Sequence, residues 1–374
     1  MLLDNKGLVN DCLMKLDKVT DDTWEDILDR YELDYSQDHL RKMAYGMRIM
    51  RDTMEDFNED EVLLELKKEK VKLADLKNSV NRNIRQLARV ENMIELIINE
   101  CNNISNFKLV DVNTVKPYKD GHKALCLISD IHYDGTDKPI NNFNKVIDYT
   151  IDKCRLHQIN QLNVMIAGDI INNELHNTIR IENREDVSKQ IVNVSKLISD
   201  GLYKLAKHIP MITVALVVGN HERSVEKYKN ALTTDTYLPV IKELIELRVD
   251  DIHNIVILPN AEVDGEIDDR FCVMNFDGKT HVVAHGDSIK NPDKNAIRTV
   301  EGYLGNSIRI DYLYLGHFHS EKSFQTYEAN VVINGALYNG SDYGKKLLLR
   351  TPEVQKLMIL NNGDKECTYN IRLG

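Results

Sequence analysis

The fold prediction starts from one stretch, Ala124-Leu125-Cys126-Leu127-Ile128-Ser129-Asp130-Ile131-His132. Its first part is a short apolar run typical of a buried β-strand, and polar residues follow it directly. Asp130 and His132 are both metal-ligand residue types, and they stand two positions apart where the predicted strand ends. Because side chains two positions apart on an extended segment point the same way, we expect both to reach the same pair of metal ions.

The same pattern recurs at four later points in the chain. Apolar runs at 162–167, 211–218, 281–284 and 312–315 lead into Gly168-Asp169, Gly219-Asn220-His221-Glu222, His285-Gly286-Asp287 and Gly316-His317-Phe318-His319. Further β-rich runs at 271–276, 331–333 and 356–360 alternate with helical stretches, which predicts a layered α/β domain. Ligands of such domains bind beyond the carboxyl ends of the strands. Asp, Asn and His without Cys suit Mn²⁺, Fe or Zn²⁺, so we expect a metal centre there.

The order D-x-H, GD, GNHE, H-G, GHxH resembles the calcineurin-like metallophosphoesterase superfamily over roughly residues 123–340. The resemblance implies a four-layer αββα sandwich and two divalent metal ions, with Mn²⁺ as the first choice and Fe or Zn²⁺ as alternatives. It assigns Asp130, His132 and His319 to the first metal, and Asn220, His285 and His317 to the second. Asp169 is expected to bridge the two.

The resemblance also assigns a catalytic role to His221, which follows the ligand Asn220. A hydroxide held between the metals is the implied nucleophile, and His221 is the implied general acid that protonates the leaving oxygen. Glu222 and Asp287 are predicted to orient neighbouring imidazoles, with surface capping as the alternative. Asn172 and Arg223 lie near the motifs and are predicted substrate contacts.

The residues that follow Asp169 distinguish between branches of the superfamily. Protein Ser/Thr phosphatases continue this block into Asp-Arg-Gly with a phosphate-binding arginine, whereas this chain continues with Ile170-Ile171-Asn172-Asn173-Glu174. DIHYDG and GHFHS look closest to DNA exonucleases of the Mre11 and SbcD type, so the expected activity is that of a DNA nuclease, phage-like and without need of a partner ATPase. Two alternatives stay open: a phosphodiesterase or phosphatase for small or cyclic nucleotides, and a catalytically idle scaffold that binds DNA or a partner.

Length and composition set the frame for these predictions. The 374 residues, 42% hydrophobic and 29% charged, are typical of a globular protein with a large catalytic domain and an accessory region. The net charge of −11 argues against a surface that is basic throughout. With no signal-peptide pattern and no apolar run near the ~18 residues of a membrane span, we expect a cytoplasmic protein without membrane contact.

Residues 1–56 are predicted to form a small helical unit. Thr23 and Ser36 are candidate helix caps, and the later helix carries Arg41, Lys42, Arg48 and Arg51 after a more acidic first part. This asymmetry is typical of a helix-turn-helix whose second helix faces DNA, and the pattern loosely resembles such modules on phage proteins. A helical hairpin that only packs on another element is the alternative.

Residues 57–104 are predicted to form a long basic helix, and 105–374 the metallophosphoesterase domain. Leu66, Leu73, Val80, Leu87 and Ile94 recur every seven positions, and Leu76, Val90 and Ile97 follow a second register. This favours a coiled-coil homodimer, although the seam could instead pack along another domain. Basic residues of this helix are candidate nucleic-acid contacts, among them Lys67, Lys70, Arg82 and Arg85.

Overall fold

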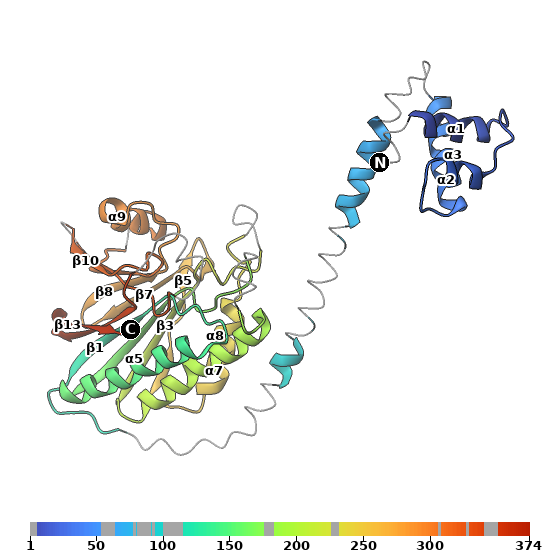
Figure 1. Ribbon diagram of the computed structural model, residues 1–374. Coiled ribbons are helices and arrows are strands. Elements are labelled where there is room, and N and C mark those ends of the chain that lie inside the picture. Colours follow the sequence, from blue (N-terminus) through green and yellow to red (C-terminus); the bar gives the residue numbers. More distant parts are fainter. Residues whose placement is uncertain are drawn as a thin grey trace. The chain divides into compact units, whose positions relative to one another are not determined.

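The computed structural model (Figure 1) describes residues 6–53, 64–77, 80, 91, 94–99, 115–175, 183–225, 232–305, 308–326, 329–339 and 351–374. The chain divides into two compact units, an N-terminal unit Met1–Val90 and a C-terminal unit Glu91–Gly374. The three segments expected from the sequence, 1–56, 57–104 and 105–374, stay a prediction.

The N-terminal unit contains three helices in its described residues: α1 (Lys6–Leu16), α2 (Trp24–Arg30) and α3 (Gln37–Thr53). Both predicted caps are present, because Thr23 forms a reciprocal capping box with Asp26 and the Ser36 hydroxyl accepts from the backbone N–H of His39. Two helices were predicted in detail, and α1 completes the core that they share. This core consists of Leu8, Val9, Cys12, Leu13, Ile27, Leu28, Leu40, Ala44 and Met47.

Residues 64–77 and 94–99 of the predicted long helix are helical. Leu66 packs against the three-helix core, and Ile97 packs against the core of the C-terminal unit. The two ends of the apolar seam therefore pack within the N-terminal and C-terminal units, respectively. Leu73, Leu76, Val80 and Ile94 lie between these ends and are exposed.

The larger sheet of the C-terminal unit has the strand order β13-β12-β1-β2-β3-β4 in the described residues. β1 to β4 are parallel, whereas β12 pairs with β1 antiparallel. Parallel strands bring their carboxyl ends to one edge, so the predicted ligands after β1, β2 and β3 gather there. The bounds are β1 (His122–Ile128), β2 (Ile159–Ala167), β3 (Met211–Val217), β4 (Ile255–Ile257), β12 (Val354–Asn361) and β13 (Asp364–Arg372).

The second sheet has the strand order β10-β11-β9-β8-β7, again in the described residues. Its central strands β8, β9 and β11 are parallel, and the outer strands β7 and β10 are antiparallel to their neighbours. A short hairpin of β5 and β6 stands apart. The bounds are β5 (Ala261–Val263), β6 (Glu266–Asp268), β7 (Phe271–Phe276), β8 (Lys279–Ala284), β9 (Tyr312–Leu315), β10 (Lys322–Gln325) and β11 (Asn330–Ile333).

The two sheets pack face to face, and helices cover both outer faces (Figure 1). Leu125 and Leu127 of β1 share a buried cluster with Val283 of β8 and Tyr314 of β9. A second cluster joins the larger sheet to the helices α5 (Asp137–Leu156), α7 (Val187–Ala206) and α8 (Leu238–Val249), and a third joins the smaller sheet to α9 (Pro292–Leu304). The predicted αββα sandwich is confirmed. None of the described helices is long and apolar enough to span a membrane.

Candidate metal centre and active site

Five strands end at one region of the sheet pair, and each is followed by side chains of the predicted metal site. The edge is shared because β1, β2 and β3 run parallel in one sheet, and β8 and β9 run parallel in the other. The side chains are Asp130 and His132 after β1, Asp169 after β2, Asn220 after β3, His285 after β8, and His317 and His319 after β9.

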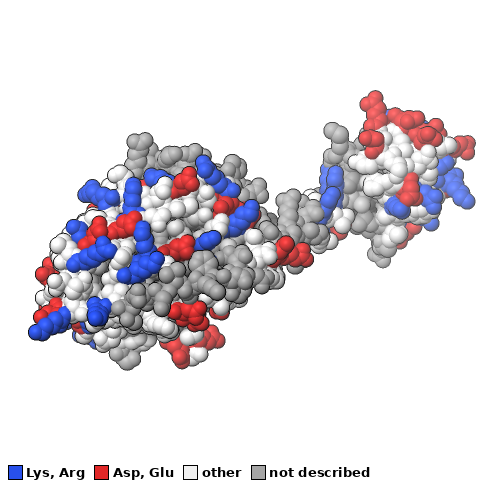
Figure 2. Space-filling model, turned by 90° about the horizontal axis from the view of Figure 1, so that it is seen from below, with Lys and Arg blue, Asp and Glu red and all other residues white. Residues whose placement is uncertain are grey.

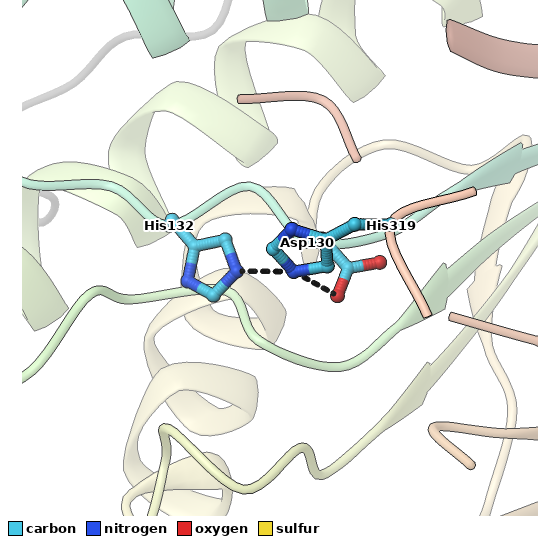
Figure 3. A group of neighbouring side chains, drawn as sticks. All are labelled: Asp130, His132 and His319. Carbon is cyan, nitrogen blue, oxygen red and sulfur yellow. Dashed lines mark hydrogen bonds and ion pairs between the residues drawn. The ribbon is translucent and has the colours of Figure 1, made fainter. Parts of the chain in front are cut away.

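The residues predicted for the first metal lie together, as Figure 3 shows. His319 Nε2 lies 3.1 Å from His132 Nε2 and 3.3 Å from Asp130 Oδ1. Asp130 is fully buried and also accepts from the backbone N–H of His317 at 3.0 Å. This contact ties the end of β1 to the end of β9, so the two halves of the group are held by the two different sheets.

The residues predicted for the second metal form an adjoining group. His285 Nε2 lies 3.2 Å from both Asp169 Oδ2 and Asn220 Oδ1. Ligand atoms of Asp169, His285 and His317 lie within 4.8 Å of one another. Asp169 Oδ2 is also 3.8 Å from His132 Nε2 in the first group, which places this carboxylate between the two groups. Its bridging role stays a prediction that this position favours.

Hydrogen bonds fix which nitrogen of each imidazole faces the site. His285 Nδ1 donates to the carbonyl of Ala167 at 2.8 Å, and His319 Nδ1 donates to Asn339 Oδ1 at 3.0 Å. The amide of Asn339 is oriented in turn, because its Nδ2 donates to the Thr351 carbonyl at 2.7 Å. Asn339 was not among the predicted site residues, and the one signal for it in the sequence is that it lies in the segment after the end of β11.

The electrostatics of the site differ between its imidazoles: burial lowers the pKa of His132 to about 3 and also lowers that of His317, whereas the nearby carboxylates favour positive charge on His285 and His319. Burial by itself lowers the pKa of His285, but the carboxylates of Asp169, Asp130 and Asp287 together outweigh this effect and raise it to about 10. Burial likewise raises the pKa of Asp169, yet His285 and His221 hold it well below its usual range. With His319 Nδ1 donating to Asn339, the Nε2 lone pair faces the Asp130 carboxylate, an arrangement that a cation stabilises. The donor set therefore fits divalent metal ions.

The ligand loops do not follow the extended geometry that the sequence argument assumed. Asp130, His132, His317 and His319 have φ values of 54°, 45°, 66° and 51°, and Asp169 has 49°. Left-handed backbone is unfavourable for such residues, at roughly 1–3 kcal/mol each, and it clusters at functional sites. The paired ligands converge because tight turns aim them, and not because they alternate along a strand.

Gly219 is required by close approach of two loops. A Cβ at this position would overlap the backbone nitrogen and the carboxylate of Asp169. Because Asp169 and Asn220 belong to different strand ends, any side chain at Gly219 would push apart the two ends that must share the site.

Glu222 has a different role from the predicted one. Its fully buried carboxylate accepts from the backbone N–H groups of Gly219, Asp169, Ile170 and Ile171 at 2.6 to 3.2 Å. Burial and the nearby Asp169 charge raise its pKa to about 7, although the N–H donors oppose this shift. Glu222 thus holds the loops after β2 and β3 together, and it orients backbone instead of an imidazole.

His221 lies beside the metal ligands, as predicted. Its ring packs edge-on against His132 with centroids 4.6 Å apart, and its Nδ1 donates to the Asn172 carbonyl at 2.8 Å. Nε2 is therefore the nitrogen available for a substrate oxygen. The Asn172 side chain, predicted to contact substrate, is instead buried and donates to Asn183 Oδ1 at 2.8 Å. Asn172 serves the site through its main chain.

The sequence profile of the calcineurin-like phosphoesterase family matches residues 124–335, more than half of the chain. The chain belongs to this family. Members are dinuclear metal-dependent hydrolases, and the described residues of this chain form three overlapping groups of potential metal ligands, one of which combines His132 and Asp169 with His221. The metal's identity stays a prediction.

Solved structures with a similar fold share little sequence with this phosphoesterase. An archaeal phosphodiesterase is 14% identical over 67% of this chain and 99% of its own, with a TM-score of 0.35. Vacuolar protein sorting 29 of Cryptosporidium parvum is 14% identical over 68% of this chain and 100% of its own, with a TM-score of 0.33. The zinc complex of its Entamoeba histolytica counterpart is 11% identical over 67% and 99%, with a TM-score of 0.33. A search of curated proteins found no match.

Two further predicted site residues lie close to the phosphoesterase centre. Asp287 is half-buried, and its charge counts among the influences on His285 and His317, but it forms no hydrogen bond to an imidazole in the described part of the chain. Arg223 donates from Nε to the Val225 carbonyl at 3.1 Å. The predicted orienting role of Asp287 through a hydrogen bond is thus not present.

The predicted nucleic-acid contacts of α3 have local partners. Lys42 pairs with Asp38 at 2.6 Å, Arg48 with Asp52 at 3.7 Å, and Arg51 with Asp17 and Asp52. The guanidinium of Arg41 lies over the Tyr45 ring. Lys67 and Lys70 are on the exposed helix 64–77, whereas Arg82 and Arg85 lie outside the described residues. On the face shown in Figure 2, basic and acidic side chains are interspersed over the phosphoesterase unit.

Proposed function

We propose that this phosphoesterase is a phosphodiesterase that cuts DNA, similar to nucleases of the Mre11 and SbcD type. One observation carries the preference for diesters. The contacts of the predicted metal ligands described above are with His, Asn, Asp and backbone groups, and none of these contacts is with a Lys or Arg side chain.

The charge of the substrate explains this preference. A phosphate monoester carries one more negative charge than a diester near neutral pH. Ile170 and Ile171 are fully buried where protein phosphatases continue into a phosphate-binding arginine, so the extra charge would lack a fixed cation there. A diester needs no such partner.

Two divalent ions, when bound, would neutralise phosphate oxygens and supply the nucleophile at neutral pH. Asp130, His132 and His319 would hold one ion, and Asn220, His285 and His317 the other, with Asp169 between them. His221 would donate a proton from Nε2 to the leaving oxygen, since its Nδ1 is occupied by the Asn172 carbonyl.

Exposed cations that follow the predicted ligand His285 along the chain support a polymeric substrate. Lys290 follows the predicted ligand His285 by five positions, and Lys294 and Arg298 lie on the helix α9 that comes next. All three are exposed, and none has an acidic partner within the described residues. Such side chains can follow a phosphate backbone away from the cleaved bond.

The proposal is tested with Mn²⁺-loaded protein on bis-p-nitrophenyl phosphate, p-nitrophenyl phosphate, cyclic nucleotides, and linear and circular single- and double-stranded DNA. We expect cleavage of the small diester and of at least one DNA, with the monoester much slower. If cyclic nucleotides are cleaved and no DNA is, the enzyme is a small-nucleotide phosphodiesterase and the nuclease proposal is wrong. Faster cleavage of the monoester than of the diester would overturn the diester argument. Metal binding without any turnover would indicate an idle scaffold.

The general acid is tested with His221→Ala on DNA. Loss of the proton donor should lower kcat by roughly 10²- to 10⁴-fold, because the deoxyribose alkoxide is a poor leaving group. His253→Ala removes an exposed imidazole outside the site and should leave kcat unchanged.

A further inference from the structure

We propose that Asn173 is the positioning residue that sets the orientation of His221 toward the leaving group. The inference rests on the proposed role of His221 as proton donor. Asn173 is not a predicted metal ligand. Its side chain acts by binding the main-chain carbonyls of neighbouring residues.

The peptide unit between Asn172 and Asn173 is held on both sides. Its carbonyl, that of Asn172, accepts from His221 Nδ1 at 2.8 Å, and its N–H, that of Asn173, donates to Gln190 Oε1 at 2.9 Å. Gln190 is fully buried and is itself fixed, because its Nε2 donates to the Glu185 carbonyl at 2.8 Å. The acceptor that orients the imidazole therefore cannot turn away without breaking buried hydrogen bonds.

The Asn173 side chain holds the backbone of His221 as well. Its Nδ2 donates to the His221 carbonyl at 2.6 Å and to the Arg223 carbonyl at 2.8 Å. The ring of His221 is thus fixed through the peptide unit that precedes Asn173, and its main chain is fixed through the Asn173 amide. The Asn172–Asn173 peptide unit thus orients the ring, and the Asn173 amide holds the main chain from which the ring extends.

The residue type fits these demands. Asn173 has a φ of 58°, in the left-handed region, where Asn and Gly are tolerated better than most residues. Only an amide also offers two N–H donors for two carbonyls on a side chain this short. The β2 loop can reach the β3 loop in this way while Glu222 separately fixes the backbone around the metal ligands.

Asn173→Gly removes the side-chain amide without straining the backbone, because Gly accepts a positive φ. The full chain is assayed on two thymidine 5′-phosphodiesters, a p-nitrophenyl ester whose phenolate leaves without a proton and a dinucleotide whose alkoxide needs one. We expect kcat on the dinucleotide to fall about tenfold to a hundredfold and kcat on the p-nitrophenyl ester by less than about threefold, with Mn²⁺ affinity unchanged.

Asn362→Gly is the matched control, since Asn362 has a φ of 53° in the exposed turn between β12 and β13. This variant should change kcat on neither substrate. Asn173→Asp, which keeps the size and the tolerance for positive φ but points an acceptor at two carbonyls, should repeat the leaving-group pattern, so a poorly folded Gly variant does not stop the test.

An equal fall on both substrates, or a fall together with Mn²⁺ affinity, would overturn the assignment of Asn173. His221→Ala is assayed beside it as the reference. If that variant affects both substrates equally, the proton-donor role itself is wrong and the inference falls with it. If His221→Ala discriminates between leaving groups and Asn173→Gly does not, only the inference is wrong.

Discussion

At the scale of a residue, a buried histidine outside the active site should make stability depend on pH. His281 is fully buried between Tyr314, whose hydroxyl is 2.9 Å from Nδ1, and the Phe276 carbonyl, 3.1 Å from Nε2. Burial lowers the pKa of His281 to about 4, below the value of about 6.5 in an unfolded chain. As the pH falls from about 6.5 to 4, the unfolded state takes up the proton first, so the folded state should lose up to about 3 kcal/mol. Urea unfolding across this range should show a shallower pH dependence for His281→Gln and an unchanged one for the exposed His253→Gln. Equal slopes for wild type and His281→Gln would contradict the assignment.

At the scale of an element, α9 is the helix on which DNA binding should depend. Lys294 and Arg298 are exposed on it without acidic partners in the described residues. The double variant Lys294→Gln/Arg298→Gln should weaken DNA binding and reduce the salt slope of affinity by about 2, one for each lost phosphate contact. Turnover of bis-p-nitrophenyl phosphate should not change. Lys196→Gln/Lys365→Gln removes the same charge from exposed positions on α7 and β13 and serves as the control for fluorescence-anisotropy titrations. An identical loss in both double variants would show that net charge, and not this helix, is responsible.

At the scale of the whole molecule, the exposed part of the heptad seam predicts a homodimer. Leu73 and Leu76 are 65% and 61% exposed, while Val71, on the opposite side of the heptad, is 60% exposed. A second copy would bury the two leucines but not the valine. Light scattering should therefore give a dimer for the wild type and for Val71→Glu, and a monomer for Leu73→Glu/Leu76→Glu with unchanged turnover of the small diester. A monomeric wild type at micromolar concentration would end this proposal.

The strands that carry the site could be predicted because their signals are local. A run such as Ala124–Ile128 is continuously apolar since it is buried on both faces, and its end is marked where Ser129 and Asp130 follow. The strand β13 was missed because it lies at a sheet edge, begins with exposed charged residues such as Lys365 and Glu366, and carries only half-buried side chains at Cys367 and Tyr369.

By itself, the sequence determined which residue types reach the site and in which order, since ligands at strand ends follow from short motifs. Only the tertiary structure decided how they are aimed. The ring of His319 depends on Asn339, that of His285 on the Ala167 carbonyl, and that of His221 on the loop of Asn173. These partners come from other strands, and no spacing along the chain encodes a hydrogen bond between segments that meet only after folding.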